Sequence, residues 1–92
     1  MAELAHVEVI VSGHVQGVFF RVFASRIAKL QNLKGYVHNL PHGNVQVVAE
    51  GYRDKLEEFT VQLRQGPPEA LVDDLKIQWS EFTGQYVNFE IR

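Results

Sequence analysis

The chain has 92 residues, enough for one small domain with a single core, so we expect one domain over residues 1–92. Nine Lys and Arg against eleven Asp and Glu give a formal net charge of −2, the wrong sign for a protein held mainly by nucleic-acid phosphates or anionic lipid. The absence of cysteine excludes disulfides, a thiolate nucleophile and a cysteine zinc site. The N-terminal MAELAHVEV has the pattern of neither a signal peptide nor a membrane span, so we expect a cytoplasmic protein.

The first 35 residues predict a strand followed by a helix. Valines alternate with other residues over 6–12, which is the period of a half-buried strand. From residue 21 to about residue 33, apolar side chains recur at steps of three and four, which predicts an amphipathic helix. These apolar side chains are Phe20, Phe23, Ala24, Ile27 and Leu30. Gly35 is expected to end the helix.

A β-hairpin and a second helix are expected next. The segments YVHN (36–39) and VQVVAE (45–50) flank the turn-forming PHGN, so we expect them to pair. Asp54 and Glu57 then have the spacing of a capping box at the start of a helix. The apolar stripe of this second helix comprises Leu56, Phe59 and Leu63. The helix is expected to end at Gly66, before two prolines.

The C-terminal third predicts two more strands, because apolar residues again alternate. The first set is Leu75, Ile77 and Trp79, and the second is Val87, Phe89 and Ile91. The order is βαββαβ with one extra strand, which predicts an α+β sandwich with both helices on one face of a mainly antiparallel sheet of four to five strands. A right-handed crossover makes the first and second strands parallel, so their C-terminal ends share one edge of the sheet.

The loop HVQGVF, between the first strand and the first helix, is a candidate anion site. Gly17 can take backbone angles that turn successive N–H groups toward one point. Arg21 falls in the first helical turn, where the helix dipole disfavours a cation by a few tenths to about 1 kcal/mol unless an anion lies there too. A guanidinium also matches phosphate oxygens in pairs. An ordinary tight turn followed by a solvated arginine is the alternative interpretation.

Asn39 ends the second strand, on the edge that the crossover rule assigns to Arg21. Its amide could accept a hydrogen bond from a water and direct that water at a phosphorus atom, although asparagine before Leu40 and Pro41 is also typical of a turn. Neither a nucleophile nor a positioned acid stands nearby in the sequence. A mixed anhydride of a carboxylic acid and phosphoric acid needs neither, because its carboxylate leaves without protonation.

Two motifs resemble the signatures of the acylphosphatase family. VSGHVQGVFFR (11–21) matches the first, and GYVHN (35–39), followed by GNV (43–45) and Gly51, matches the second. The likeness covers essentially the whole chain. It implies a ferredoxin-like sandwich and hydrolysis of small acyl phosphates to a carboxylate and inorganic phosphate without metal or cofactor. Apart from the resemblance we expect a monomer, with pairing of the edge strands over 36–39 and 87–91 to another chain as the alternative. His38 is a departure, since the family commonly has Lys or Arg there. Alternation along the strand predicts that its side chain points away from that of Asn39.

The resemblance also implies roles for particular residues. Arg21 would bind the phosphate and Asn39 would orient the attacking water. The backbone amides that would complete the phosphate cradle are those of Val15, Gln16, Gly17, Val18, Phe19 and Phe20.

Three other functions are alternatives to catalysis on acyl phosphates. The four histidines have no compact ligand spacing, which argues against a zinc site. An RNA-binding sheet would expose aromatic residues on its central strands, whereas Glu8, Gln46 and Glu50 take the outward positions here. A non-catalytic module that senses a phosphorylated metabolite or partner would keep the cradle and lack turnover. We therefore expect a small-molecule partner, with neither nucleic acid nor membrane.

Overall fold

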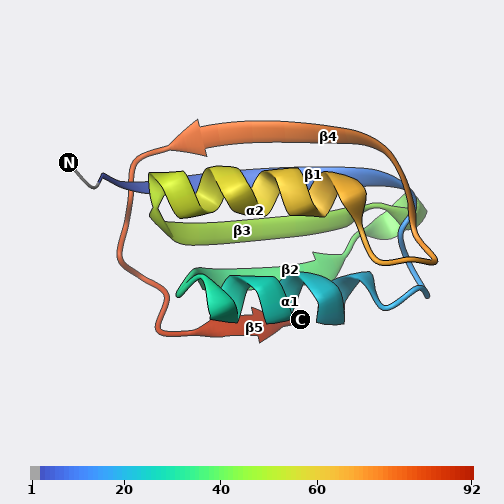
Figure 1. Ribbon diagram of the computed structural model, residues 1–92, viewed down its shortest axis with the longest axis horizontal. Coiled ribbons are helices and arrows are strands. Elements are labelled where there is room, and N and C mark those ends of the chain that lie inside the picture. The colour runs from blue at the N-terminus through green and yellow to red at the C-terminus, as the bar shows by residue number, and fades with distance from the viewer. Residues whose placement is uncertain (1–2) are drawn as a thin grey trace.

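The computed structural model describes residues 3–92 and consists of one sheet with two helices on one of its faces (Figure 1). The expected domain of residues 1–92 includes Met1 and Ala2, which lie outside the described residues. The elements are β1 (Leu4–His14), α1 (Phe20–Leu30), β2 (Lys34–Asn39), a 3₁₀ turn (Pro41–Gly43), β3 (Val45–Tyr52), α2 (Arg53–Gln65), β4 (Leu71–Ser80) and β5 (Phe89–Ile91).

The sheet has five strands in the order β4-β1-β3-β2-β5. β3 pairs antiparallel with both β1 and β2, so β1 and β2 are parallel to each other and end at the same edge of the sheet. β4 pairs antiparallel with β1, and β5 pairs parallel with β2. The expected α+β ferredoxin-like sandwich, its mainly antiparallel sheet and the β2–β3 hairpin are therefore confirmed.

The core lies between the sheet and the two helices. Alternate residues of β1 and β3 face the helices and are fully buried, as the period of two predicts. In Figure 1, α2 lies over β1 and β3, while α1 lies over β2 and β5. The apolar stripes of the helices supply Phe20, Ala24, Ala28, Leu56, Phe59 and Leu63 to this core. Leu30, expected in the stripe of α1, is 84% exposed because it is the last residue of the helix and lies away from the sheet. Burial on one face of each element therefore holds the two layers together.

The end of α1 differs from the expected one. The helix ends at Leu30 rather than near residue 33, and the N–H of Leu33 donates to the carbonyl of Ala28 at 2.8 Å. Asn32, not a glycine, takes the left-handed conformation there, with φ 58°. Gly35 lies inside β2, where an added Cβ would come within 1.9 Å of the Val48 carbonyl oxygen. Close packing against β3, rather than helix termination, requires this glycine.

The expected capping box is wrong. α2 begins at Arg53 after Tyr52, with no side-chain hydrogen bond at its cap. Asp54 instead lies within the first turn, where a carboxylate complements the positive end of the helix dipole. Glu57 forms an ion pair with Arg53 at 3.6 Å between Nε and Oε2. The helix starts without the cap because its apolar stripe packs on the sheet.

The two C-terminal strands follow the predicted alternation only in part. Leu75 is buried and Trp79 packs against the core, but Ile77 is 37% exposed because β4 lies at the edge of the sheet. β5 contains only three residues, of which Phe89 is buried. Val87 precedes the strand and is 87% exposed, so its place in the alternating set is wrong.

Candidate functional site

The edge at which β1 and β2 end is hollowed by a cavity of about 260 Å³. The lining residues are Val15, Gly17, Phe19, Phe20, Arg21, Val22, Asn39 and Ile91. The structure thus brings Arg21 and Asn39 to one cavity, together with four of the six residues of the predicted cradle. We call this hollow the anion cavity.

The loop of residues 15–19 forms one wall of the anion cavity. Gly17 has φ 75° and Phe19 has φ 64°, so two of its five residues adopt the left-handed conformation. Among the described residues, the backbone N–H groups of 15–19 donate to no protein acceptor. Successive unpaired N–H groups in a curved loop next to a helix N-terminus form a concavity suited to an anion.

Arg21 adds a fixed positive charge to the same wall. It lies in the first turn of α1, a turn that carries no acidic residue. Its Nη1 donates to the backbone oxygen of Arg92 at 3.1 Å, which directs the guanidinium toward the end of β5. Helix dipole, loop amides and guanidinium therefore give this end of the sheet a positive potential.

Asn39 reaches the anion cavity from the end of β2. It is the last residue of β2, and Val37 on the same face is fully buried beneath the helices. Asn39 is exposed, which leaves its amide free to contact a solute. His38 points to the other face, as expected, where it makes a hydrogen bond with the Gln46 side chain. Gln46 in turn donates to Glu8 at 2.6 Å.

Gln16 and Val18 do not line the anion cavity. The Gln16 side-chain amide donates to the carbonyl oxygens of Leu40 and Asn44, each at 2.8 Å. The loop after β1 is thereby attached to the turn that follows Asn39. Val18 is 5% exposed and packs inward. The motif pointed to the backbone of Gln16, and no local pattern indicated what its side chain binds.

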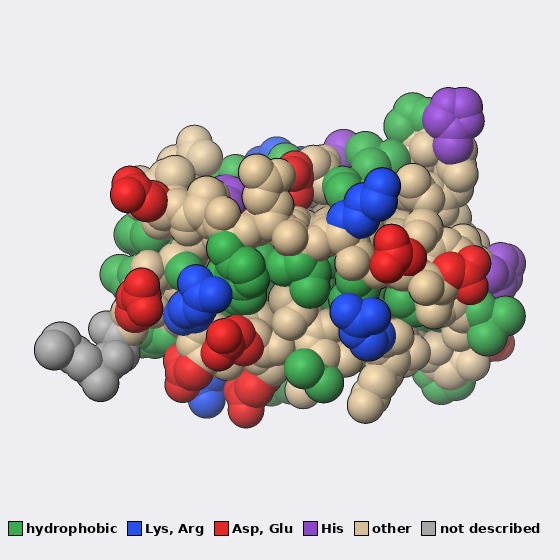
Figure 2. All heavy atoms as spheres, turned by 90° about the horizontal axis from the view of Figure 1, so that it is seen from above, with side chains coloured by type: hydrophobic (Ala, Val, Ile, Leu, Met, Phe, Trp, Pro, Cys, Tyr) green, Lys and Arg blue, Asp and Glu red, His purple; other side chains and the backbone are tan. Residues whose placement is uncertain are grey.

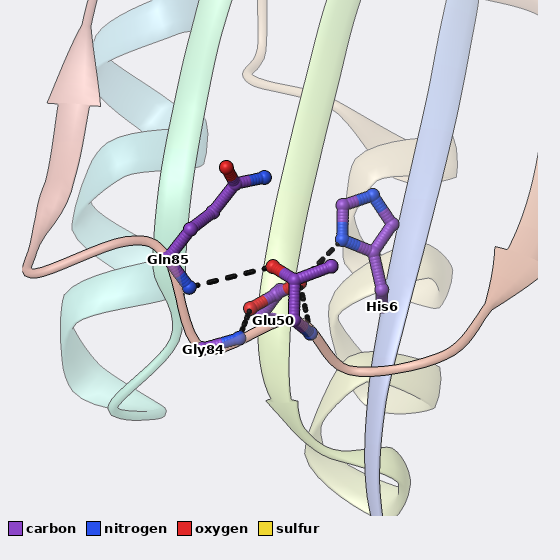
Figure 3. Close-up of polar contacts among 5 residues, drawn as sticks. His6, Glu50, Gly84 and Gln85 are labelled. Carbon is purple, nitrogen blue, oxygen red and sulfur yellow. Dashed lines mark hydrogen bonds and ion pairs between the residues drawn. The ribbon is translucent and has the colours of Figure 1, made fainter.

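A buried carboxylate lies elsewhere on the molecule. Residues 81–88 cross the face of the sheet opposite the helices, and Glu50 contacts this segment (Figure 3). Glu50 accepts hydrogen bonds from the hydroxyl and N–H of Thr83 at 2.7 and 2.9 Å and from the N–H of Gly84 at 2.9 Å, and it pairs with His6 at 2.6 Å. Burial alone would raise its pKa, but these hydrogen bonds together hold the pKa of Glu50 below its ordinary value. Glu50 points outward as expected, yet it is only 1% exposed.

A metal site, a membrane-spanning helix and a nucleic-acid-binding surface each require particular features in a protein. Among residues 3–92, His, Asp and Glu side chains form no group of three that could hold a metal ion. No described helix has the length and apolar character needed to cross a bilayer. Figure 2, seen from the β4 side, shows acidic and basic side chains interspersed, without a continuous basic stripe over the described residues of that face. A basic stripe is the usual footprint of a nucleic-acid-binding surface.

Known proteins are similar to this chain in sequence and in fold over most of its length. The acylphosphatase family model matches residues 7–91. An acylphosphatase of Deinococcus radiodurans is 49% identical over 75 residues, covering 82% of this chain and 86% of that protein. One of Pyrobaculum aerophilum is 40% identical over 90 residues, covering 97% and 95%. The crystal structure of an acylphosphatase from Bacillus subtilis has a TM-score of 0.92 at 33% identity, over 98% of this chain and 99% of that one.

Proposed function

The chain belongs to the acylphosphatase family and is a hydrolase of acyl phosphates, and from that premise we propose that the anion cavity binds the phosphate and cleaves the carboxyl–phosphate bond without a metal ion. The observation that carries this proposal is the common cavity of Arg21 and Asn39, beside a loop of unpaired amides. Family membership also argues against a non-catalytic sensing module.

Phosphate binding is assigned to Arg21 and to the backbone amides of residues 15–20. The guanidinium can donate two hydrogen bonds to phosphate oxygens, and the loop amides can take the remaining oxygen. A dianion there would offset the unfavourable position of Arg21 in the first helical turn. These donors also lie where negative charge must be stabilised during transfer. The same contacts would hold the inorganic phosphate product.

Asn39 orients the attacking water in this proposal. Its amide oxygen accepts a hydrogen bond from the water, and its NH₂ group can donate to a phosphate oxygen. The water oxygen forms a bond to phosphorus as the bridging P–O bond breaks. The electron pair of that bond leaves with the carboxylate, and both protons of the water end on the phosphate. Positioning carries most of the rate, because the carboxylate leaves without a general acid.

The decisive experiment measures hydrolysis of an aromatic acyl phosphate in the presence of a metal chelator. We expect the native protein to keep its activity, because no step needs a metal. Arg21→Ala should lower kcat/KM by about 100-fold or more, the usual effect of removing one transition-state donor. Asn39→Ala should lower kcat by a similar factor of about 100 with little change in KM, because it positions the water rather than the phosphate.

Matched controls are Arg64→Ala, an exposed arginine in the last turn of α2, and Asn88→Ala, an exposed asparagine before β5. Both should retain native activity. Full turnover by folded Asn39→Ala protein would contradict the role of Asn39, and loss of native activity with chelator would contradict metal independence. The monomeric state and the cytoplasmic location stay predictions from the sequence.

A further inference from the structure

A second cavity, of about 480 Å³, lies beside the anion cavity, between α1 and the turn of residues 66–69. Its lining is mostly apolar and includes Phe19, Val22, Phe23, Pro67 and Pro68. Phe19 and Val22 line both cavities, so the two cavities adjoin at this part of the loop and helix. We call the second one the apolar pocket. Its size is within the range of small-molecule sites.

Phe19 is an unusual residue to find between the two cavities. Its φ of 64° is strained for an aromatic residue, and its side chain is 73% exposed. The ring therefore contributes little to the core, while glycine at this position would avoid the strain. Val22, the other shared residue, is 37% exposed. Both apolar side chains are thus available to a bound molecule.

The line from the attacking water through phosphorus to the leaving group indicates which cavity the leaving group faces. In phosphoryl transfer the attacking and leaving oxygens lie roughly in line through phosphorus. Asn39 and Ile91 line only the anion cavity, whereas Pro67 and Pro68 line only the apolar pocket. A water held by Asn39 would therefore direct the leaving carboxylate away from β2 and toward the segment that both cavities share.

We propose that the apolar pocket binds the acyl group of the substrate. It selects acyl phosphates whose acyl chain is uncharged, apolar and longer than acetyl. This inference rests on the proposed function, because it needs the phosphate in the anion cavity. One bridging oxygen separates the phosphorus from the acyl carbon, so the acyl chain enters whichever cavity adjoins the phosphate. The apolar pocket is that cavity.

The charges at the pocket also favour an uncharged acyl group. Arg26 and Glu69 both line it, so neither sign dominates. An acyl chain ending in a carboxylate would meet Arg26 but also the Glu69 carboxylate and several apolar walls. Desolvating such a charge costs more than an exposed ion pair returns.

The test compares kcat/KM for acetyl, butanoyl and hexanoyl phosphate. Their carboxylates are nearly equal in basicity, so differences report binding of the chain rather than leaving-group quality. We expect kcat/KM to rise by up to about fourfold per methylene, the equivalent of ~0.8 kcal/mol of transfer free energy, until the pocket is filled. From acetyl to hexanoyl phosphate the rise should reach at least about tenfold.

Two variants place this selectivity in the pocket. Pro68→Trp fills the pocket from an exposed turn position, and Phe23→Gln replaces an aromatic wall by an amide. Each should lower the hexanoyl-to-acetyl ratio by about tenfold, because most of the chain loses its apolar contacts. Should Phe23→Gln fail to fold, Pro68→Trp still decides the matter. Leu30→Gln, an exposed residue at the far end of α1, is the matched control and should leave the ratio unchanged.

The outcomes separate the pocket from the phosphate chemistry. Equal turnover of acetyl and hexanoyl phosphate by the native protein, or an unchanged ratio in Pro68→Trp, would overturn the pocket proposal alone. Faster turnover of succinyl than of hexanoyl phosphate would show that Arg26 selects a charged chain and would also overturn it. If the native protein hydrolysed all three alkanoyl phosphates no faster than the Arg21→Ala variant does, the proposed function would be overturned, and the acyl pocket with it.

Discussion

Two glycines near the end of β1 are required for different physical reasons. Gly13 has φ 123°, and a Cβ added there would lie 2.2 Å from the Leu71 carbonyl oxygen. Gly17 has φ 75°, with open space around the position of a Cβ. The first lets β4 approach β1 where their register shifts, and the second only shapes the anion loop.

Replacing each glycine with alanine should separate the two effects. Gly17→Ala should lower the free energy of unfolding by only about 1 kcal/mol, the cost of a left-handed alanine. Gly13→Ala adds a backbone clash to a disfavoured φ and should cost roughly 3 kcal/mol or more. Urea denaturation measures both values. Equal destabilisation by the two changes would contradict the close packing of β4 against Gly13.

At the scale of elements, Gln16 connects the two halves of the candidate site. Its two hydrogen bonds tie the loop that precedes Arg21 to the turn that follows Asn39. Without them, loop and strand would be positioned independently by β1 and β2. The relative placement of guanidinium and amide therefore depends on a residue that lies outside the cavity.

Gln16→Met keeps the length of the side chain and removes both hydrogen bonds. We expect the free energy of unfolding to fall by about 1–3 kcal/mol, because two carbonyl oxygens lose their donor. kcat/KM for an acyl phosphate should fall as well, since misplacement of reacting groups slows transfer. Gln78→Met, at an exposed position on β4, controls for the chemical change. Native kinetics in folded Gln16→Met protein would remove the positioning role.

At the scale of the whole molecule, Glu50 attaches the 81–88 segment to the centre of the sheet. The hydrogen bonds from Thr83 and Gly84 hold this segment across β3 before the chain enters β5. β5 in turn brings Ile91 to the anion cavity, and the backbone oxygen of Arg92, just after this strand, accepts a hydrogen bond from Arg21. The buried carboxylate is therefore part of the path that places the C-terminal strand.

The lowered pKa of Glu50 predicts a pH dependence of stability. Its folded-state pKa lies below the ordinary value of 4.5, so ionised Glu50 stabilises the fold above that pH. This contribution should disappear as the pH falls through the folded-state pKa. Urea denaturation between pH 3 and 7 should show Glu50→Gln less stable than native at neutral pH, with the difference shrinking in acid. Glu81→Gln, at an exposed position, should follow the native curve.

The sequence by itself determined the order of the elements, the core faces of β1, β3 and α2, most of the core face of α1, and the shared edge of Arg21 and Asn39. These features follow from local periodicity and from the handedness of one crossover. It misjudged the end of α1, the start of α2 and the environment of Val87. Packing against neighbouring elements, rather than local preference, decides such boundaries.

Only the tertiary structure decided which side chains make contacts between distant parts of the chain. Gln16 finds its acceptors 24 and 28 positions away, and Arg21 finds the Arg92 oxygen 71 positions away. Glu50 is buried by a segment that no local pattern placed over the sheet, and the apolar pocket forms between α1 and a turn from another part of the chain. Such contacts depend on how the helices pack on the sheet and on how the loops run over it. The spacing of residues along the chain does not specify either.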